Sequence, residues 1–258
     1  MTSKNNKYLP MKSYVLTLLF FSTSFIYAQI NAGIVKYKEV IITKPDLQKA
    51  EEQGWAEWAS MVPDSVVFYK KLLFNESISS YTNIPMDENP DEQNMVKMMM
   101  RRYANANNET YVNKLDNKYV EKKDFMGKTF LIKGKPEEKK WKMTGEIKSI
   151  LDFPCLKATF EDSTGVIEAW FTTEIAASTG PENYGGLPGL IMQLTIVKEK
   201  RTLTADELSL KEVNSTEFKE PTEGKEVTRE EFYKIVKEKM QEMRQAGGFG
   251  GMGRSDNK

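Results

Sequence analysis

The segment from residue 179 to residue 197, which reads TGPENYGGLPGLIMQLTIV, constrains the fold more than any other part of the chain. Its first half is rich in glycine and proline, which interrupt regular elements. Pro188 and Gly189 stand in the order that a type II turn prefers, with a positive φ at the glycine. From Leu190 onward apolar residues recur at every second position, which is typical of a pleated strand. The segment therefore predicts a tight loop that leads directly into a β-strand.

Similar alternation recurs along most of the chain, with short turns such as Asp116-Asn117 and Met126-Gly127 between the segments. It predicts a mainly β (α+β) fold, with a single large antiparallel curved sheet or open half-barrel and a few peripheral helices. A capping box at Thr228 and Glu231 marks the start of one helix. A second helix, carrying Trp55 and Trp58, is expected to cover the apolar face of the sheet. The expected strands lie at 31–42, 66–74, 77–83, 110–115, 118–123, 128–133, within 141–160 as more than one strand, and at 166–172, 190–197 and 201–210.

The first 28 residues have the pattern of a signal peptide. They contain three lysines and no acid, an apolar run at 14–21, and Ala28 as a small residue at the expected cleavage site. We expect a single β-rich domain at 29–245, with a mobile Met- and Asn-rich insertion at 85–108, and a disordered Gly-rich tail at 246–258. No later segment is long and apolar enough to predict a transmembrane span. The predicted location is therefore the periplasm or the cell exterior.

Composition excludes several classes of function. The chain has no histidine, which rules out imidazole-activated nucleophiles and histidine-bearing zinc or iron sites. Without residues 1–28 there are 34 basic and 37 acidic residues, a net charge of 34 − 37 = −3, so bulk charge does not favour a nucleic-acid partner. Cys155 is the only cysteine, and because it alternates with apolar neighbours we expect a buried, unreactive thiol. No cofactor is predicted.

Four features occur in an order that identifies a family resemblance: Trp141, the lone Cys155, the strand AWFT at 169–172 and the hexapeptide GLPGLI. The chain resembles the GLPGLI family, exported proteins of Bacteroidetes-type bacteria whose biochemical role is not established. The resemblance spans about residues 111–197 and implies an envelope protein of this fold type. Glycine and proline supply shape and no reactive group, so we expect the hexapeptide to be structural. Its residues are Gly186, Leu187, Pro188, Gly189, Leu190 and Ile191.

The first functional hypothesis is a non-enzymatic binding protein, or an accessory of outer-membrane machinery, with a hydrophobic cavity for a lipophilic or peptide ligand. Loops on a rigid sheet often bind ligands, which makes Tyr184, Leu187 and Pro188 candidates for the mouth of this cavity. Glu168 and Trp170 are further candidates, because Glu168 alternates with Val166 and Trp170 on a face that is otherwise apolar.

Two alternatives stay open. One is a carboxylate-dependent hydrolase of envelope glycans or peptides that uses two acids from a loosely spaced set. The other is a Cu(I) site at Met95, Met98 and Met99, since thioethers bind soft Cu(I), although the neighbouring Arg101 and Arg102 would repel a cation. No catalytic residue and no other metal ligand is predicted. The acids of the hydrolase hypothesis are Asp152, Glu161, Asp162, Glu168 and Glu174.

Overall fold

Strands that follow one another in the chain form a large open sheet. The computed structural model of the chain describes residues 31–87, 95–162 and 165–245, so the predicted signal peptide and the predicted Gly-rich tail lie outside the described residues. The strands are β1 (Gly33–Ile42), β2 (Ser65–Phe74), β3 (Ile78–Ile84), β4 (Glu109–Asn113), β5 (Lys118–Phe125), β6 (Lys128–Gly134), β7 (Lys142–Ile150), β8 (Phe153–Asp162), β9 (Gly165–Thr172), β10 (Leu190–Ile196), β11 (Arg201–Leu210) and β12 (Lys225–Val227). Their order in the sheet is β12-β6-β5-β4-β3-β2-β1-β11-β10-β9-β8-β7.

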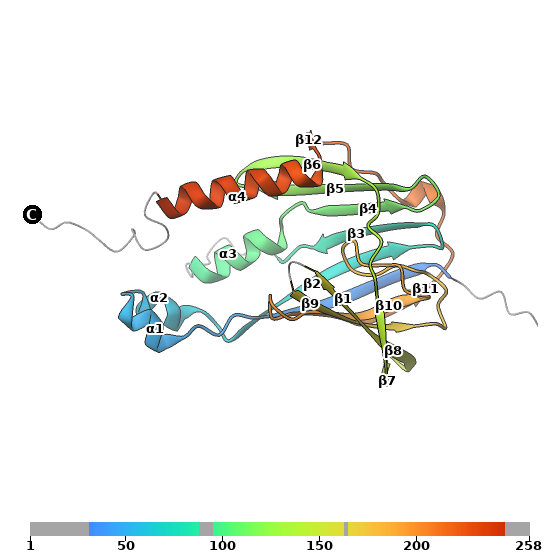
Figure 1. Cartoon of the computed structure of the whole chain (residues 1–258), viewed down its shortest axis with the longest axis horizontal. Helices are drawn as coiled ribbons and strands as arrows, with labels where there is room; N and C mark the ends of the chain where they lie inside the picture. Colours follow the sequence, from blue (N-terminus) through green and yellow to red (C-terminus); the bar gives the residue numbers. More distant parts are fainter. Residues whose placement is uncertain (1–30, 88–94, 163–164, 246–258) are drawn as a thin grey trace, which may run out of the picture.

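The sheet is curved and is not closed into a barrel, which confirms the predicted fold class. Neighbouring strands are antiparallel, except that β12 pairs with β6 in parallel. β6 and β7 lie near opposite edges of the sheet, and residues 135–141, here called the strap, connect them. Figure 1 shows the strap crossing between the two facing halves of the sheet. The concave face is therefore bounded on one side by a segment of the chain itself.

Three segments cover parts of the concave face. The loop between β9 and β10, residues 173–189, is here called the signature loop, and it inserts Ile175, Ala177 and Leu187 into the main core. Helix α4 (Arg229–Gln245) places Phe232 against Phe130 of β6. Helix α3 (Met95–Ala104) packs through Ala104 and Met100 near Phe68 of β2. Each cover excludes water from an apolar part of the sheet and contributes to stability in proportion to the area buried.

The helix expected to carry Trp55 and Trp58 and to cover the apolar face of the sheet does not cover it, so that prediction is wrong. Gly54, with a φ of +77°, separates two short helices, α1 (Leu47–Glu52) and α2 (Ala56–Met61). Figure 1 shows both beyond the end of the sheet that lies away from the strap. Trp58 is accordingly 39% exposed. On the convex face, Val213 and Phe218 of the segment after β11 pack over Tyr111 and Leu131.

The capping box predicted for α4 is confirmed. The backbone N–H of Thr228 donates to Glu231 Oε2 at 2.7 Å, and the backbone N–H of Glu231 donates to Thr228 Oγ1 at 3.2 Å. This reciprocal pair satisfies two donors that the first turn of a helix leaves free. The cap fixes where α4 begins and therefore directs Phe232 and Tyr233 toward the concave side of the sheet.

The signature loop is held by backbone geometry and by Trp141 at the end of the strap. Trp141 Nε1 donates to the carbonyl of Gly185 at 2.9 Å. Gly189 has a φ of +155°, whereas a type II turn predicts about +80°. A Cβ on Gly189 would lie 1.9 Å from the carbonyl oxygen of Thr172. Glycine is therefore required here by the close approach of two backbone segments, and the predicted turn type is wrong.

Candidate functional site

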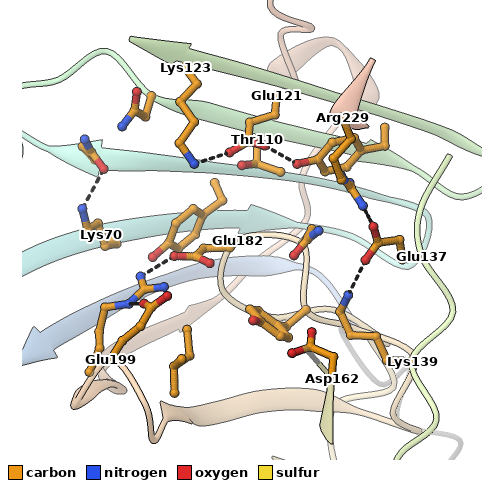
Figure 2. Close-up of a pocket in the computed structure, with 18 of the residues that line it drawn as sticks. Lys70, Thr110, Glu121, Lys123, Glu137, Lys139, Asp162, Glu182, Glu199 and Arg229 are labelled. Carbon is orange, nitrogen blue, oxygen red and sulfur yellow. Dashed lines mark hydrogen bonds and ion pairs between the residues drawn. The ribbon is translucent and has the colours of Figure 1, made fainter. Parts of the chain in front are cut away.

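A cavity of about 600 Å³ lies in the concavity, between the sheet, the strap, the signature loop, α3 and α4. This volume falls within the range of about 300–1,000 Å³ that is typical of sites for small molecules. Its lining combines charged side chains of both signs with tyrosines and asparagines (Figure 2). The lining residues are Ile41, Lys70, Tyr81, Asn83, Tyr103, Asn108, Thr110, Tyr119, Glu121, Lys123, Glu137, Lys139, Asp162, Glu182, Asn183, Tyr184, Ile196, Glu199, Arg201, Arg229 and Tyr233.

The floor of the cavity is a network of buried charges. Glu39, which is fully buried on β1, lies between Lys70 of β2 and Arg201 of β11, with contacts of 3.2 Å and 3.0 Å. Arg201 also pairs with Glu182 of the signature loop and, at 2.9 Å, with Glu199. Buried charges are tolerated only when they are paired and hydrogen-bonded. The network therefore joins the centre of the sheet to the signature loop through a single guanidinium group.

Two charges of this network, those of Glu182 and Arg201, are fixed near neutral pH. Burial alone would raise the pKa of Glu182, but the Arg201 guanidinium outweighs it and holds the pKa below its ordinary value. Burial would lower the pKa of Arg201, but the carboxylates of Glu182 and Glu39 raise it. Both groups are therefore ionised at neutral pH, and the Arg201–Glu182 pair supplies two permanent charges to the floor.

A second set of ion pairs lies on the opposite wall. Glu137 of the strap contacts Lys139 at 3.2 Å and also pairs with Arg229 at the start of α4. On β5, Lys123 contacts Glu121 at 3.3 Å. Figure 2 shows these pairs around the cavity. The strap is therefore tied to α4 by an ion pair that is itself part of the lining.

Tyrosines provide the remaining polar surface. Burial raises the pKa of Tyr81, Tyr119 and Tyr184, and that of Tyr103 to about 12, so their hydroxyl groups stay protonated at neutral pH. The hydroxyl of Tyr119 donates to Glu121 Oε2 at 2.6 Å. The buried hydroxyl of Tyr81 has no hydrogen-bond partner among the described residues. Tyr233 of α4 is 64% exposed and adds an open aromatic ring to the lining.

Of the five residues predicted to bind a ligand, the structure brings one into the cavity. Tyr184 lines it. Leu187 is 2% exposed and belongs to the core, and Pro188 is exposed outside the lining. Glu168 and Trp170 are also outside it. Lys157 Nζ lies 3.4 Å from Glu168, and Lys148 Nζ lies 4.2 Å above the Trp170 ring.

The prediction of a hydrophobic cavity is wrong for this concavity. Alternation predicts that one face of the sheet is apolar, but the signature loop and α4 cover apolar parts of the concave face. The uncovered part carries the charged residues. A signal for them is present in the sequence, because Glu39 and Lys70 occupy strand positions whose neighbours at a spacing of two, such as Tyr37 and Leu72, are apolar and buried.

The two alternative hypotheses stay predictions. Of the acids proposed for a hydrolase, only Asp162 lines the cavity. A general acid needs a raised pKa, whereas that of Glu182 is lowered. Met98 and Met99 are 53% and 44% exposed on α3, and adjacent helical residues do not face each other. Among the described residues, no group of three or more Cys, Asp or Glu side chains is arranged to hold a metal ion.

Comparison with known proteins adds a short match. Residues 161–193 match a family described as "Protein of unknown function (Porph_ging)". This stretch contains β9 and the GLPGLI hexapeptide, and the GLPGLI assignment remains a resemblance. No curated protein matches the chain in sequence.

Within the described part of the chain, no helix has the length and apolar character needed to cross a membrane.

Two solved structures are similar to part of this chain. "Structure of PNGF-II in C2 space group" has 12% sequence identity to this chain and a TM-score of 0.47, and the match covers 80% of this chain and 32% of the chain in that structure. "Structure of PNGF-II in P21 space group" has 14% sequence identity and a TM-score of 0.48, and the match covers 80% of this chain and 33% of the chain in that structure. The present chain therefore spans about a third of the length of these two structures.

Proposed function

We propose that this chain is an exported cell-envelope protein that binds a polar ligand in its concave cavity without changing the ligand chemically. The observation that carries the proposal is the lining of the cavity: about 600 Å³ of space enclosed by paired charges and protonated tyrosines. Such a surface offers many hydrogen-bond donors and acceptors in fixed positions. A lipophilic ligand would displace water from the donor and acceptor positions that these pairs leave open, and each buried group left unsatisfied in this way costs about 1–3 kcal/mol.

The titration behaviour of the lining favours binding over catalysis. Acid–base catalysis is most efficient when the pKa of the catalytic group lies near the working pH. The pKa of Glu182 is displaced downward and those of the lining tyrosines upward. Burial lowers the pKa of Lys139 against the opposing effect of the Asp162 and Glu182 carboxylates, and its ammonium group pairs with Glu137 at 3.2 Å. These groups serve better as fixed contacts than as proton carriers.

Export is part of the proposal and rests on residues 1–28, with their three lysines, apolar run and Ala28. N-terminal sequencing of the protein from its own host tests it. A mature chain that begins near Gln29 is the expected result. A chain that retains Met1 or Met11 would remove the basis for placing the protein in the envelope.

Native mass spectrometry of the protein purified gently from its own host tests the binding proposal. We expect an added mass on the wild-type chain. Asn183→Trp should abolish it, because the new ring fills the cavity from the signature loop. Thr173→Trp, on an exposed residue of the same loop outside the lining, is the matched control and should retain it. A wild-type chain without added mass, or equal adducts on both variants, would refute a ligand in this cavity.

The same preparation tests the absence of catalysis. The released ligand is returned to a stoichiometric amount of protein and its mass is followed with time. An unchanged mass is expected of a binding protein. Conversion to smaller products would favour the carboxylate-dependent hydrolase instead, and Asp162→Asn would then be the first variant to examine, because Asp162 lines the cavity.

A further inference from the structure

We propose that the ligand of the concave cavity is a short, neutral oligosaccharide. The inference rests on the proposed binding function and specifies the class of ligand. It is drawn from three properties of the lining: its charges are already paired, its strands have no free edge, and its accessible aromatic rings are tyrosines.

The charges of the lining disfavour a strongly charged ligand. Each of the five cations has a carboxylate partner in the structure. An anionic ligand would therefore have to displace a carboxylate from a partly buried pair, which leaves that carboxylate without its partner. A ligand without charge can instead add hydrogen bonds to pairs that remain intact. The cations are Lys70, Lys123, Lys139, Arg201 and Arg229.

The topology disfavours an extended peptide. One common way to bind a peptide is to add it as a strand to an open sheet edge, where backbone groups supply the affinity. The strands that contribute to the lining, β1 to β5, β8, β10 and β11, each have a neighbour on both sides. Most of their backbone groups are occupied within the sheet, although the β3–β4 ladder ends at Thr82 and the β7–β8 ladder ends at Thr159. The cavity therefore presents side chains to its ligand and no free strand edge.

Side chains of this kind suit the chemistry of a sugar. A pyranose ring has an apolar face of C–H groups that packs on an aromatic ring, and its hydroxyl groups both donate and accept hydrogen bonds. Tyr103 and Tyr233, which are 43% and 64% exposed, provide rings from α3 and α4. Tyrosine hydroxyls and Asn183 can donate and accept, and the paired carboxylates accept. The buried hydroxyl of Tyr81 still lacks a partner among the described residues.

An array of immobilised neutral oligosaccharides, probed with the mature protein, tests the inference. The strongest hit is then titrated in solution by calorimetry. Tyr233→Ala and Tyr103→Ala should each raise the Kd at least tenfold. Tyr69→Ala is the matched control, because Tyr69 is 37% exposed on β2 and points away from the cavity that its neighbour Lys70 lines. It should leave the Kd within about twofold of the wild-type value.

The outcomes separate this inference from the proposed function. A native ligand in the cavity, together with no hit on the array, would overturn the oligosaccharide and leave the binding function standing. If acetylated, amidated alanine tripeptides bind in the cavity and the sugars do not, the oligosaccharide is overturned in favour of a peptide ligand. Sugar binding that Tyr233→Ala and Tyr103→Ala do not weaken would place the sugar outside the cavity and overturn the inference. Equal binding of acidic and neutral sugars would refute the charge argument.

Discussion

Replacement of Gly189 by alanine should destabilise the protein more than an ordinary glycine substitution. The new Cβ would lie 1.9 Å from the carbonyl oxygen of Thr172, and ordinary van der Waals contact begins at 3.4 Å. The difference, 3.4 − 1.9 = 1.5 Å, must be taken up by backbone. Thr172 is fully buried at the end of β9 and pairs with Leu190, so the separation must occur inside the core.

The expected loss in the free energy of unfolding of Gly189→Ala has two parts. Holding a residue other than glycine in a sparsely populated region of φ and ψ costs about 1–3 kcal/mol. Displacing the start of β10 also loses part of the burial of Leu190 and Ile191, each of which stabilises the fold by about 1.5–3 kcal/mol when fully buried. We expect a total loss of about 3–5 kcal/mol in the free energy of unfolding.

Urea denaturation of the mature wild-type chain, Gly189→Ala and Gly186→Ala measures this loss. Gly186 is the matched control, because it also has a positive φ, +85°, but a Cβ added there would lie 4.0 Å from Trp141 Nε1, which is an ordinary contact distance. Its substitution should cost only about 1–2 kcal/mol for the left-handed backbone. Equal losses for the two variants would refute the close-approach argument. A stable Gly189→Ala that had lost only ligand binding would show that the residue serves the site directly.

Three further predictions concern the buried groups. Glu39→Gln should destabilise the protein by about 3 kcal/mol, because Lys70 and Arg201 each lose a buried carboxylate partner. Glu199→Gln is the control and should cost less than about 1 kcal/mol, because the Glu199 carboxylate is 52% exposed. Similar losses for the two variants in urea denaturation would contradict the argument from burial. The pKa of Glu182 is below its ordinary 4.5 in the folded chain, so its contribution to stability is present above that value and is lost as the pH falls through the folded pKa. Denaturation midpoints of wild type and Glu182→Gln should therefore converge on acidification below 4.5, and a constant difference would count against the Arg201 pair. Burial raises the pKa of the Cys155 thiol to about 11, so iodoacetamide at pH 7.5 should label it only after unfolding, and rapid labelling of the folded chain would show that it is accessible.

Strand positions could be predicted well because the period of two is a local property. The segment expected at 201–210 is β11 with the same bounds, and 66–74 differs from β2 by one residue. The prediction failed within 141–160, where more than one strand was expected before Pro154. β7 is continuous through Lys142–Ile150, but its register shifts between Met143 and Ile147, and Gly145 has a φ of +83°. A bulge of this kind interrupts the alternation without ending the strand.

The site was harder to predict because its residues meet across distant strands. Glu39, Lys70 and Arg201 come from β1, β2 and β11, which become neighbours only in the folded sheet. Periodicity places Glu39 and Lys70 on an inward face, where an unpaired charge is costly, so a partner could have been expected. It cannot identify that partner. Periodicity also does not show which part of the apolar face the signature loop covers. That coverage leaves the polar part of the face open and so determines the character of the cavity.

The signature loop has two roles in adjacent residues. Leu187 and Gly189 anchor it, one by filling the core and the other by allowing the backbone to approach Thr172. Glu182, Asn183 and Tyr184 precede this anchor and line the cavity. The anchor has no contact of its own with the cavity, so it fixes where the three lining residues lie without determining what they bind. Chains that share the hexapeptide are therefore expected to share the loop geometry, whereas their ligands should differ with the residues at positions 182–184. Exchanging the residues at positions 183 and 184 between two such chains, with the Glu182–Arg201 pair left intact, should transfer ligand preference and leave the urea midpoint nearly unchanged, while exchanging the hexapeptide should not alter preference.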